Sequence, residues 1–151
     1  MNKFSKLDRE AFQKFIEEKN IDSIDITAIF TDDTVLENTA GMLSFPKIGK
    51  CKLEIRVKEG GSIPHFHIIS LQNKFLCAVC LHVNKYFKHG PYTGELNSSQ
   101  RVVLDDYLRT QKDGVSVWEY MVSIWNISYN NMNVEIDEQP DYTSMKESLH
   151  K

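Results

Sequence analysis

The sequence lacks the features that mark several common classes of protein. Its 151 residues include only three cysteines, an odd number, so a disulfide-stapled secreted domain is not expected. No segment approaches the roughly 18 consecutive apolar residues of a membrane-spanning helix. The charged N-terminal stretch also lacks the apolar core of a signal peptide. We therefore expect a cytoplasmic protein that does not contact membranes.

An excess of charge of one sign is also missing. Eighteen Lys and Arg residues against 21 Asp and Glu residues give a formal net charge of −3. Because polyanions are attracted by surplus positive charge, this balance argues against DNA binding, and any contact with RNA must be local. No internal repeat or low-complexity segment is present. The length and the 41% hydrophobic content predict a single compact domain.

The middle of the chain predicts three antiparallel strands. Residues 51–58 alternate apolar and charged side chains, which is typical of a half-buried strand. Residues 59–62 (EGGS) predict a turn into a second strand that ends near Leu71. Gln72 and Asn73 then turn into a third strand at residues 74–83. These segments together predict a meander.

Helices are predicted on both sides of the meander. Residues 5–19 carry an apolar stripe, as do the two segments that follow Asn97 or Ser98 and Ser116. These polar residues are good helix caps. Lys112–Gly114 is predicted to end the first of the two later helices.

The predicted fold class is α+β. An antiparallel sheet of three to five strands packs against two C-terminal helices and an N-terminal helix. The single domain has three predicted parts: an N-terminal helix and irregular linker (1–47), a sheet-helix core (48–126) and an extended tail (131–151).

The lengths of the two turns predict the register of the strands. A four-residue loop pairs Lys58 with Ile63, and a two-residue loop pairs Leu71 with Lys74. Both registers gather apolar side chains on one face, and a slip of one residue would bury charge. The opposite face, called the histidine face below, then carries Lys52, Glu54, Arg56, His65, His67, Ala78, Cys80 and His82.

Three interpretations of the histidine face are open. It can be an ordinary polar face that meets solvent or a partner. It can be a zinc site, because histidines two apart on a strand point the same way; the candidate ligands are His65, His67, Cys80 and His82. It can also cleave RNA without a metal, which needs a base, an acid and a cation; the candidate catalytic residues are Glu54, Arg56, His65, His67 and His82.

Three motifs follow one another along the chain: Pro64–Ile68 on a strand, Gly94–Leu96 before a helix with Gln100, Arg101, Val103 and Leu104, and a second helix with Trp125 and Asn126. On these residues the chain, over about residues 48–126, resembles a bacterial family of unknown function whose members carry a Pro-His-Phe-His strand. The resemblance implies a bacterial or phage gene that travels in two-gene modules of toxin-antitoxin type or on mobile elements. It brings no established chemistry.

The predicted function is that of a small binding or regulatory protein that presents the histidine face and the following loop to a protein or RNA partner. A small metal-independent ribonuclease of toxin type is the alternative. No cofactor is expected. If the histidines do bind a metal ion, zinc is the expected ion. The predicted binding residues are Lys52, Arg56, His65, His67, His82, Lys85, Tyr86 and His89.

Overall fold

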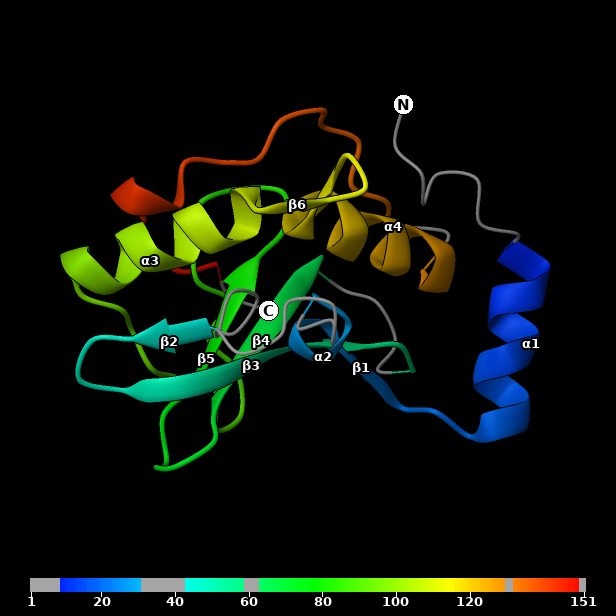
Figure 1. Cartoon of the computed structure of the whole chain (residues 1–151), viewed down its shortest axis with the longest axis horizontal. Helices are drawn as coiled ribbons and strands as arrows, with labels where there is room; N and C mark the ends of the chain where they lie inside the picture. The colour runs from blue at the N-terminus through cyan, green and yellow to red at the C-terminus, as the bar shows by residue number, and fades with distance from the viewer. Residues whose placement is uncertain (1–8, 31–42, 59–62, 130–131, 150–151) are drawn as a thin grey trace.

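A five-stranded antiparallel sheet, a small two-stranded sheet and a layer of helices make up the fold, as a computed structural model shows (Figure 1). The structure describes residues 9–30, 43–58, 63–129 and 132–149. In chain order the elements are α1 (Arg9–Lys19), β1 (Ser23–Asp25), α2 (Ile26–Phe30), β2 (Leu43–Phe45), β3 (Gly49–Arg56), β4 (His65–Ser70), β5 (Leu76–Cys80), α3 (Ser98–Arg109), β6 (Gln111–Lys112), β7 (Val115–Ser116), α4 (Val117–Ser128) and the 3₁₀ turn η3 (Tyr142–Ser144).

The sheet has five strands in the order β1-β3-β4-β5, and β2 pairs with another part of β3. Glu54 faces His67 across β3 and β4, and His65 faces Cys80 across β4 and β5. Both predicted registers are therefore confirmed, as is the α+β class. The predicted helix boundary at residues 5–8 lies outside the described residues.

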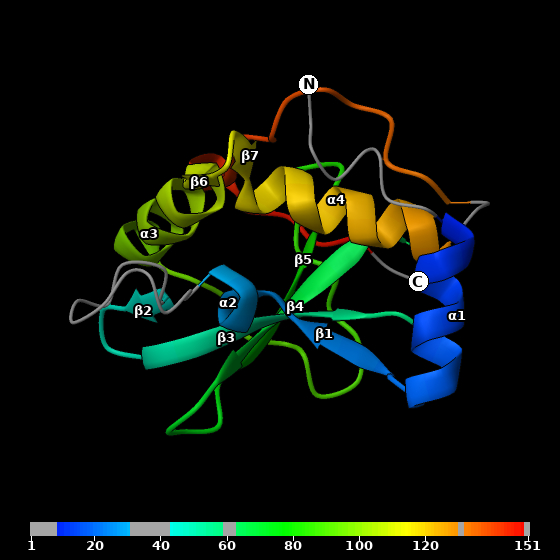
Figure 2. The same cartoon turned by 45° about the vertical axis from the view of Figure 1, so that its right-hand side comes forward.

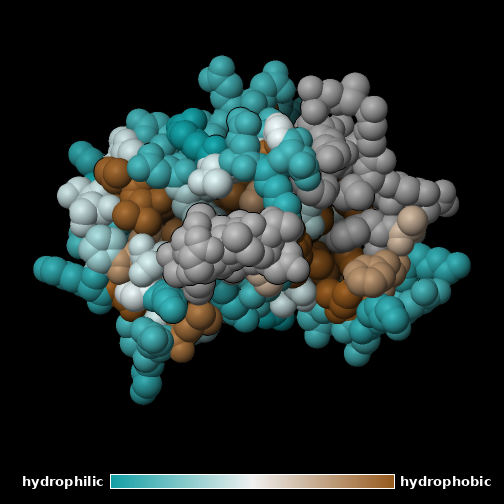
Figure 3. All heavy atoms as spheres, in the orientation of Figure 1, coloured by the Kyte–Doolittle hydropathy of each residue, from teal (hydrophilic) through white to brown (hydrophobic). Residues whose placement is uncertain are grey.

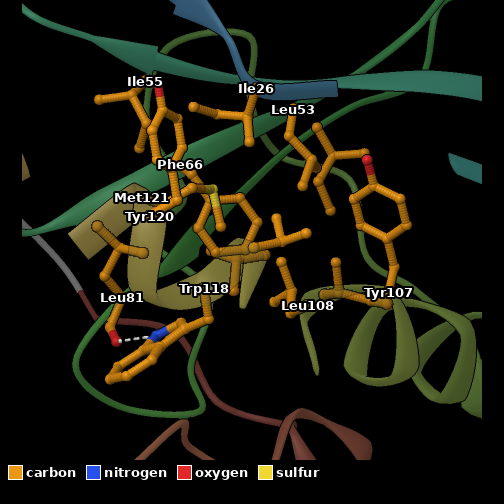
Figure 4. Packing of buried hydrophobic residues seen from close by; sticks show 14 of the residues in the cluster. Ile26, Leu53, Ile55, Phe66, Leu81, Tyr107, Leu108, Trp118, Tyr120 and Met121 are labelled. Atoms are coloured by element: carbon orange, nitrogen blue, oxygen red, sulfur yellow. Dashed lines mark hydrogen bonds between the residues drawn. The ribbon is translucent and has the colours of Figure 1, made fainter. Parts of the chain in front are cut away.

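The apolar side of the sheet packs against α3 and α4 (Figure 2). Ile55 and Phe66 from the sheet and Leu108 and Met121 from the helices are completely buried in this layer. The indole nitrogen of Trp118 also donates a hydrogen bond of 3.0 Å to the carbonyl of Leu81 (Figure 4). This core leaves the histidine face on the other side of the sheet.

Both C-terminal helices begin where the sequence predicts, because Asn97 and Ser116 each form a reciprocal capping box. The predicted end of α3 was wrong, since the helix stops at Arg109. Asp113 and Gly114, with φ values of 58° and 81°, form the turn between β6 and β7. Two consecutive residues with positive φ suit a tight hairpin, which explains why Asp-Gly is found there.

The C-terminal segment, predicted as an extended tail, is anchored in the core. Tyr142 and Met145 are completely buried, and the hydroxyl of Tyr142 donates a 2.6 Å hydrogen bond to the carbonyl of Cys80. Tyr86 then exchanges backbone hydrogen bonds with Glu147 and Leu149. This segment therefore holds the chain just after β5 in place.

The face seen in Figure 3 is largely hydrophilic, with apolar residues gathered in separate groups on its left and right sides. No helix within the described ranges is long and apolar enough to cross a membrane. The N-terminal helix α1 lies against the end of α4 and buries Ile16, rather than lying across the sheet (Figure 2).

Candidate metal centre

The middle of the histidine face is buried, although the sequence predicted that the face would be presented to a partner. His65 and His67 are only 4% and 2% exposed, and Glu54 is 7% exposed. The reason is the chain after β5, residues 84–94, called the covering loop below. Its Phe87 ring packs at 4.8 Å from the His65 ring, and its Tyr92 ring stacks on His67 at 3.8 Å. The covering loop therefore buries these histidines.

The covering loop brings a third histidine to the pair on β4. His65 and His67 point to the same side because side chains alternate along a strand. The ring of His89 lies 4.9 Å from His65 and 5.2 Å from His67, measured between centroids. One nitrogen from each of the three rings can be chosen so that these three atoms all lie within 4.8 Å of one another. Three potential metal ligands therefore converge.

Backbone carbonyls hold two of the three rings through Nδ1. The Ile63 carbonyl lies 2.7 Å from His65 Nδ1, and the Phe87 carbonyl lies 2.7 Å from His89 Nδ1. Because a carbonyl oxygen can only accept, Nδ1 carries the hydrogen in both rings. The lone pair of each ring is then on Nε2, the nitrogen that a metal would bind.

Glu54 holds the ring of His67 in the same way, through Nδ1. Its Oε1 lies 3.1 Å from His67 Nδ1. This hydrogen bond with His67 lowers the pKa of Glu54, against the opposing effect of its burial. Glu54 is therefore a carboxylate that accepts the hydrogen, and the lone pair of His67 is also on Nε2.

The two Nε2 atoms of His67 and His89 lie only 3.3 Å apart. With a hydrogen on both Nδ1 atoms, two lone pairs would face each other at this distance unless a cation lies between them. A proton or a metal ion between the two nitrogens would remove this repulsion. Two nitrogens bound to one tetrahedral zinc ion at about 2.0–2.1 Å are about 3.3–3.4 Å apart, so the observed spacing fits a shared metal ion.

Aromatic rings enclose this histidine cluster (His65, His67 and His89). Besides Phe87 and Tyr92, the ring of Trp125 on α4 lies 5.6 Å from His65. Apolar surroundings exclude water and strengthen the interaction between a cation and its ligands. The site is therefore a cluster of polar nitrogens among aromatic rings.

Two of the predicted metal ligands lie outside the cluster. The thiol of Cys80 is directed to the carbonyl of Tyr86 at 3.9 Å, and burial raises its pKa to about 12. His82 follows the end of β5, and its Nδ1 is buried with no hydrogen-bond partner among the described residues. The structure thus replaces Cys80 and His82 of the predicted set with His89.

The other predicted site residues also have separate positions. Arg56 is exposed at the end of β3, and Lys52 is half-buried on the same strand. Lys85 forms an ion pair of 3.1 Å with Glu147. Tyr86 is buried, with its hydroxyl hydrogen-bonded to the backbone of Leu96. Of the predicted catalytic set, Glu54, His65 and His67 are brought together, whereas Arg56 and His82 are not part of the cluster.

Sequence reasoning placed His89 only in a binding loop and missed its role in the cluster. The available signal was a histidine close to aromatic residues in the sequence KYFKHGPY, directly after the third strand. Comparison of the chain with protein-family models found no match, and neither did searches of curated proteins and of solved structures.

Proposed function

We propose that the protein binds one divalent transition metal ion, zinc above all, through Nε2 of His65, His67 and His89. The observation that carries this proposal is the 3.3 Å contact between His67 Nε2 and His89 Nε2, in rings whose Nδ1 atoms already have acceptors. A shared cation accounts for this contact, and a third imidazole lies beside it.

The partners behind the ligands support the same proposal. Histidines that bind metals generally donate their other ring hydrogen to a carboxylate or a backbone carbonyl, which fixes the ring and makes it a better donor. All three rings have such a partner: Ile63 for His65, Glu54 for His67 and Phe87 for His89.

Zinc suits the ligand set better than other common ions. Three imidazoles are a familiar zinc site, whereas calcium and magnesium prefer oxygen ligands. Copper and nickel also accept imidazole. Binding would tie the covering loop to β4, so the metal should stabilise the folded chain by about 2.7 kcal/mol at a free concentration of 100 times Kd.

The test is metal analysis and thermal unfolding of protein purified without a histidine tag. We expect close to one equivalent of zinc and a rise in melting temperature on zinc addition. His89→Ala should abolish both effects, whereas the matched control His82→Gln, outside the cluster, should keep both. Wild-type protein that gains neither zinc nor stability would refute the proposal, as would loss of binding in His82→Gln alone.

The predicted binding or regulatory role and the metal-independent ribonuclease stay predictions. Treatment with a chelator distinguishes the metal-independent ribonuclease from the proposed metal centre. RNA cleavage that persists in EDTA with unchanged melting would favour the ribonuclease.

A further inference from the structure

The outer side of the sheet, opposite the core, is buried over only part of its length. The row that contains Glu54 and His67 lies under the covering loop and is buried. The next row toward the β4–β5 turn consists of Lys52, Ile69 and Leu76, which pair across β3, β4 and β5. These three side chains point to the same side as the histidines, because side chains alternate along a strand, but they are only half-buried. The sheet therefore keeps an open part beyond the covering loop.

Two turns at this end of the sheet extend the open part. The amide of Leu71 donates a 2.9 Å hydrogen bond to the carbonyl of Lys50, and the side chain of Asn73 donates one of 2.8 Å to the carbonyl of Ile48. Lys50 and Lys74 are exposed, and Leu71 is 56% exposed, the most of any large hydrophobic residue in the described ranges. The β4–β5 turn also projects from the sheet (Figures 1 and 2). The surface called the open face below consists of Lys50, Lys52, Ile69, Leu71, Lys74 and Leu76.

The open face carries positive charge that nothing beside it offsets. Its three lysines form no ion pair with any residue in the ranges that the structure describes. Two acidic side chains beside it already have partners, since Glu54 binds His67 and Glu95, which follows the covering loop, binds Lys88. The chain as a whole has a net charge of −3, so this face is a local exception. Its positive potential favours a negatively charged partner.

The other half of the open face is aliphatic, which narrows the choice of partner. Ile69, Leu71 and Leu76 offer apolar surface that is stabilised by contact with apolar groups. Single-stranded nucleic acids are instead held by aromatic rings on which the bases stack. The one aromatic residue beside these side chains in the sequence, Phe75, packs against the core. Lysines interspersed with aliphatic side chains therefore suit an acidic peptide better than RNA.

We propose that the open face binds a segment of a partner protein in which Asp or Glu residues are interspersed with aliphatic ones. The carboxylates pair with the lysines, and the aliphatic side chains contact Ile69, Leu71 and Leu76. Neighbouring strands are about 4.8 Å apart and alternate residues of one strand about 7 Å apart, so a short segment reaches all six residues. None of them belongs to the histidine cluster, and the proposal is independent of the metal centre.

The experiment is an NMR titration of the full chain, labelled at the methyl groups of isoleucine and leucine, with a peptide made of Glu-Glu-Leu repeats. We expect saturable shifts centred on Ile69, Leu71 and Leu76. The affinity should fall as salt is added, because exposed ion pairs are screened. A peptide made of Lys-Lys-Leu repeats has the same aliphatic content and the opposite charge, so it should not bind.

Charge reversal on the open face gives a matched pair of variants. Lys50→Glu combined with Lys74→Glu should lower the affinity for the Glu-Glu-Leu peptide on the order of tenfold or more, because two attractions become repulsions. The control combines Lys14→Glu with Lys19→Glu, which changes the net charge equally at two exposed lysines of α1. This control should bind the peptide as wild type does.

Three results would overturn the proposal. The first is a wild-type protein whose methyl signals show no saturable shift with the Glu-Glu-Leu peptide. The second is an equal loss of affinity in the α1 control, which would mean that only the net charge matters. The third is tighter binding of oligouridine or of phosphatidylserine vesicles than of the peptide, which would identify RNA or a membrane surface as the partner instead.

Discussion

Replacement of Glu54 by glutamine tests whether the residues behind the ligands control the metal. Glu54 accepts the Nδ1 hydrogen of His67 at 3.1 Å as a carboxylate. Glutamine keeps the size and an oxygen acceptor but loses the charge, so His67 becomes a weaker ligand. Loss of such a partner typically lowers metal affinity about 10- to 100-fold, which corresponds to about 1.4 to 2.8 kcal/mol.

Calorimetric titration with zinc measures this change directly, and thermal unfolding gives a second measurement. In a chain of this length 1 kcal/mol corresponds to roughly 2–4 °C. The rise in melting temperature at a fixed excess of zinc should therefore be roughly 3 to 11 °C smaller in Glu54→Gln than in wild type. Glu18→Gln is the matched control, because this exposed carboxylate pairs with Lys14 on α1. Equal zinc affinity in Glu54→Gln and wild type would refute the reasoning.

Three further predictions concern the fold around the centre. Phe66→Ala removes a completely buried ring and should lower the free energy of unfolding by about 3–5 kcal/mol; a loss below 1 kcal/mol in denaturant melts would contradict the core described above. Tyr142→Phe removes the hydrogen bond to the Cys80 carbonyl and should cost about 1–3 kcal/mol, because a buried acceptor loses its partner; unchanged melting would show that the C-terminal segment contributes no such bond. Burial lowers the pKa of His82 below 6.5, so the unfolded chain takes up this proton first and stability should fall as pH drops below about 6.5. His82→Gln should lose this part of the pH dependence, and an unchanged profile would contradict it.

The strands and their registers were predictable because the signals are local. Alternation along β3 shows which side chains face the core, and the loop after Leu71 fixes how β4 and β5 pair. A register error of one residue would exchange the two faces, and the cost of burying charge excludes it. The positions of His65 and His67 on one face, opposite the core, follow from these rules alone.

The burial of that face and the third ligand were not predictable in the same way. The covering loop has no periodic pattern, and its path depends on contacts with distant parts of the chain. Tyr86 is held by Glu147 and Leu149, which lie about 60 residues further along the sequence. His89 comes within reach of His67 only when these long-range contacts hold the covering loop in place. The same long-range contacts explain why the C-terminal segment was expected to be an extended tail.

X-ray absorption at the zinc edge of the zinc-loaded protein tests the central claim most directly, because it identifies the ligands of the metal. The proposed centre predicts imidazole scattering from three histidines, with nitrogen at about 2.0–2.1 Å, one further light ligand and no sulfur. His89→Ala should abolish binding and with it the zinc signal, since this residue shares the ion with His67. A sulfur shell at about 2.3 Å, or oxygen ligands without imidazole, would contradict the three-histidine centre.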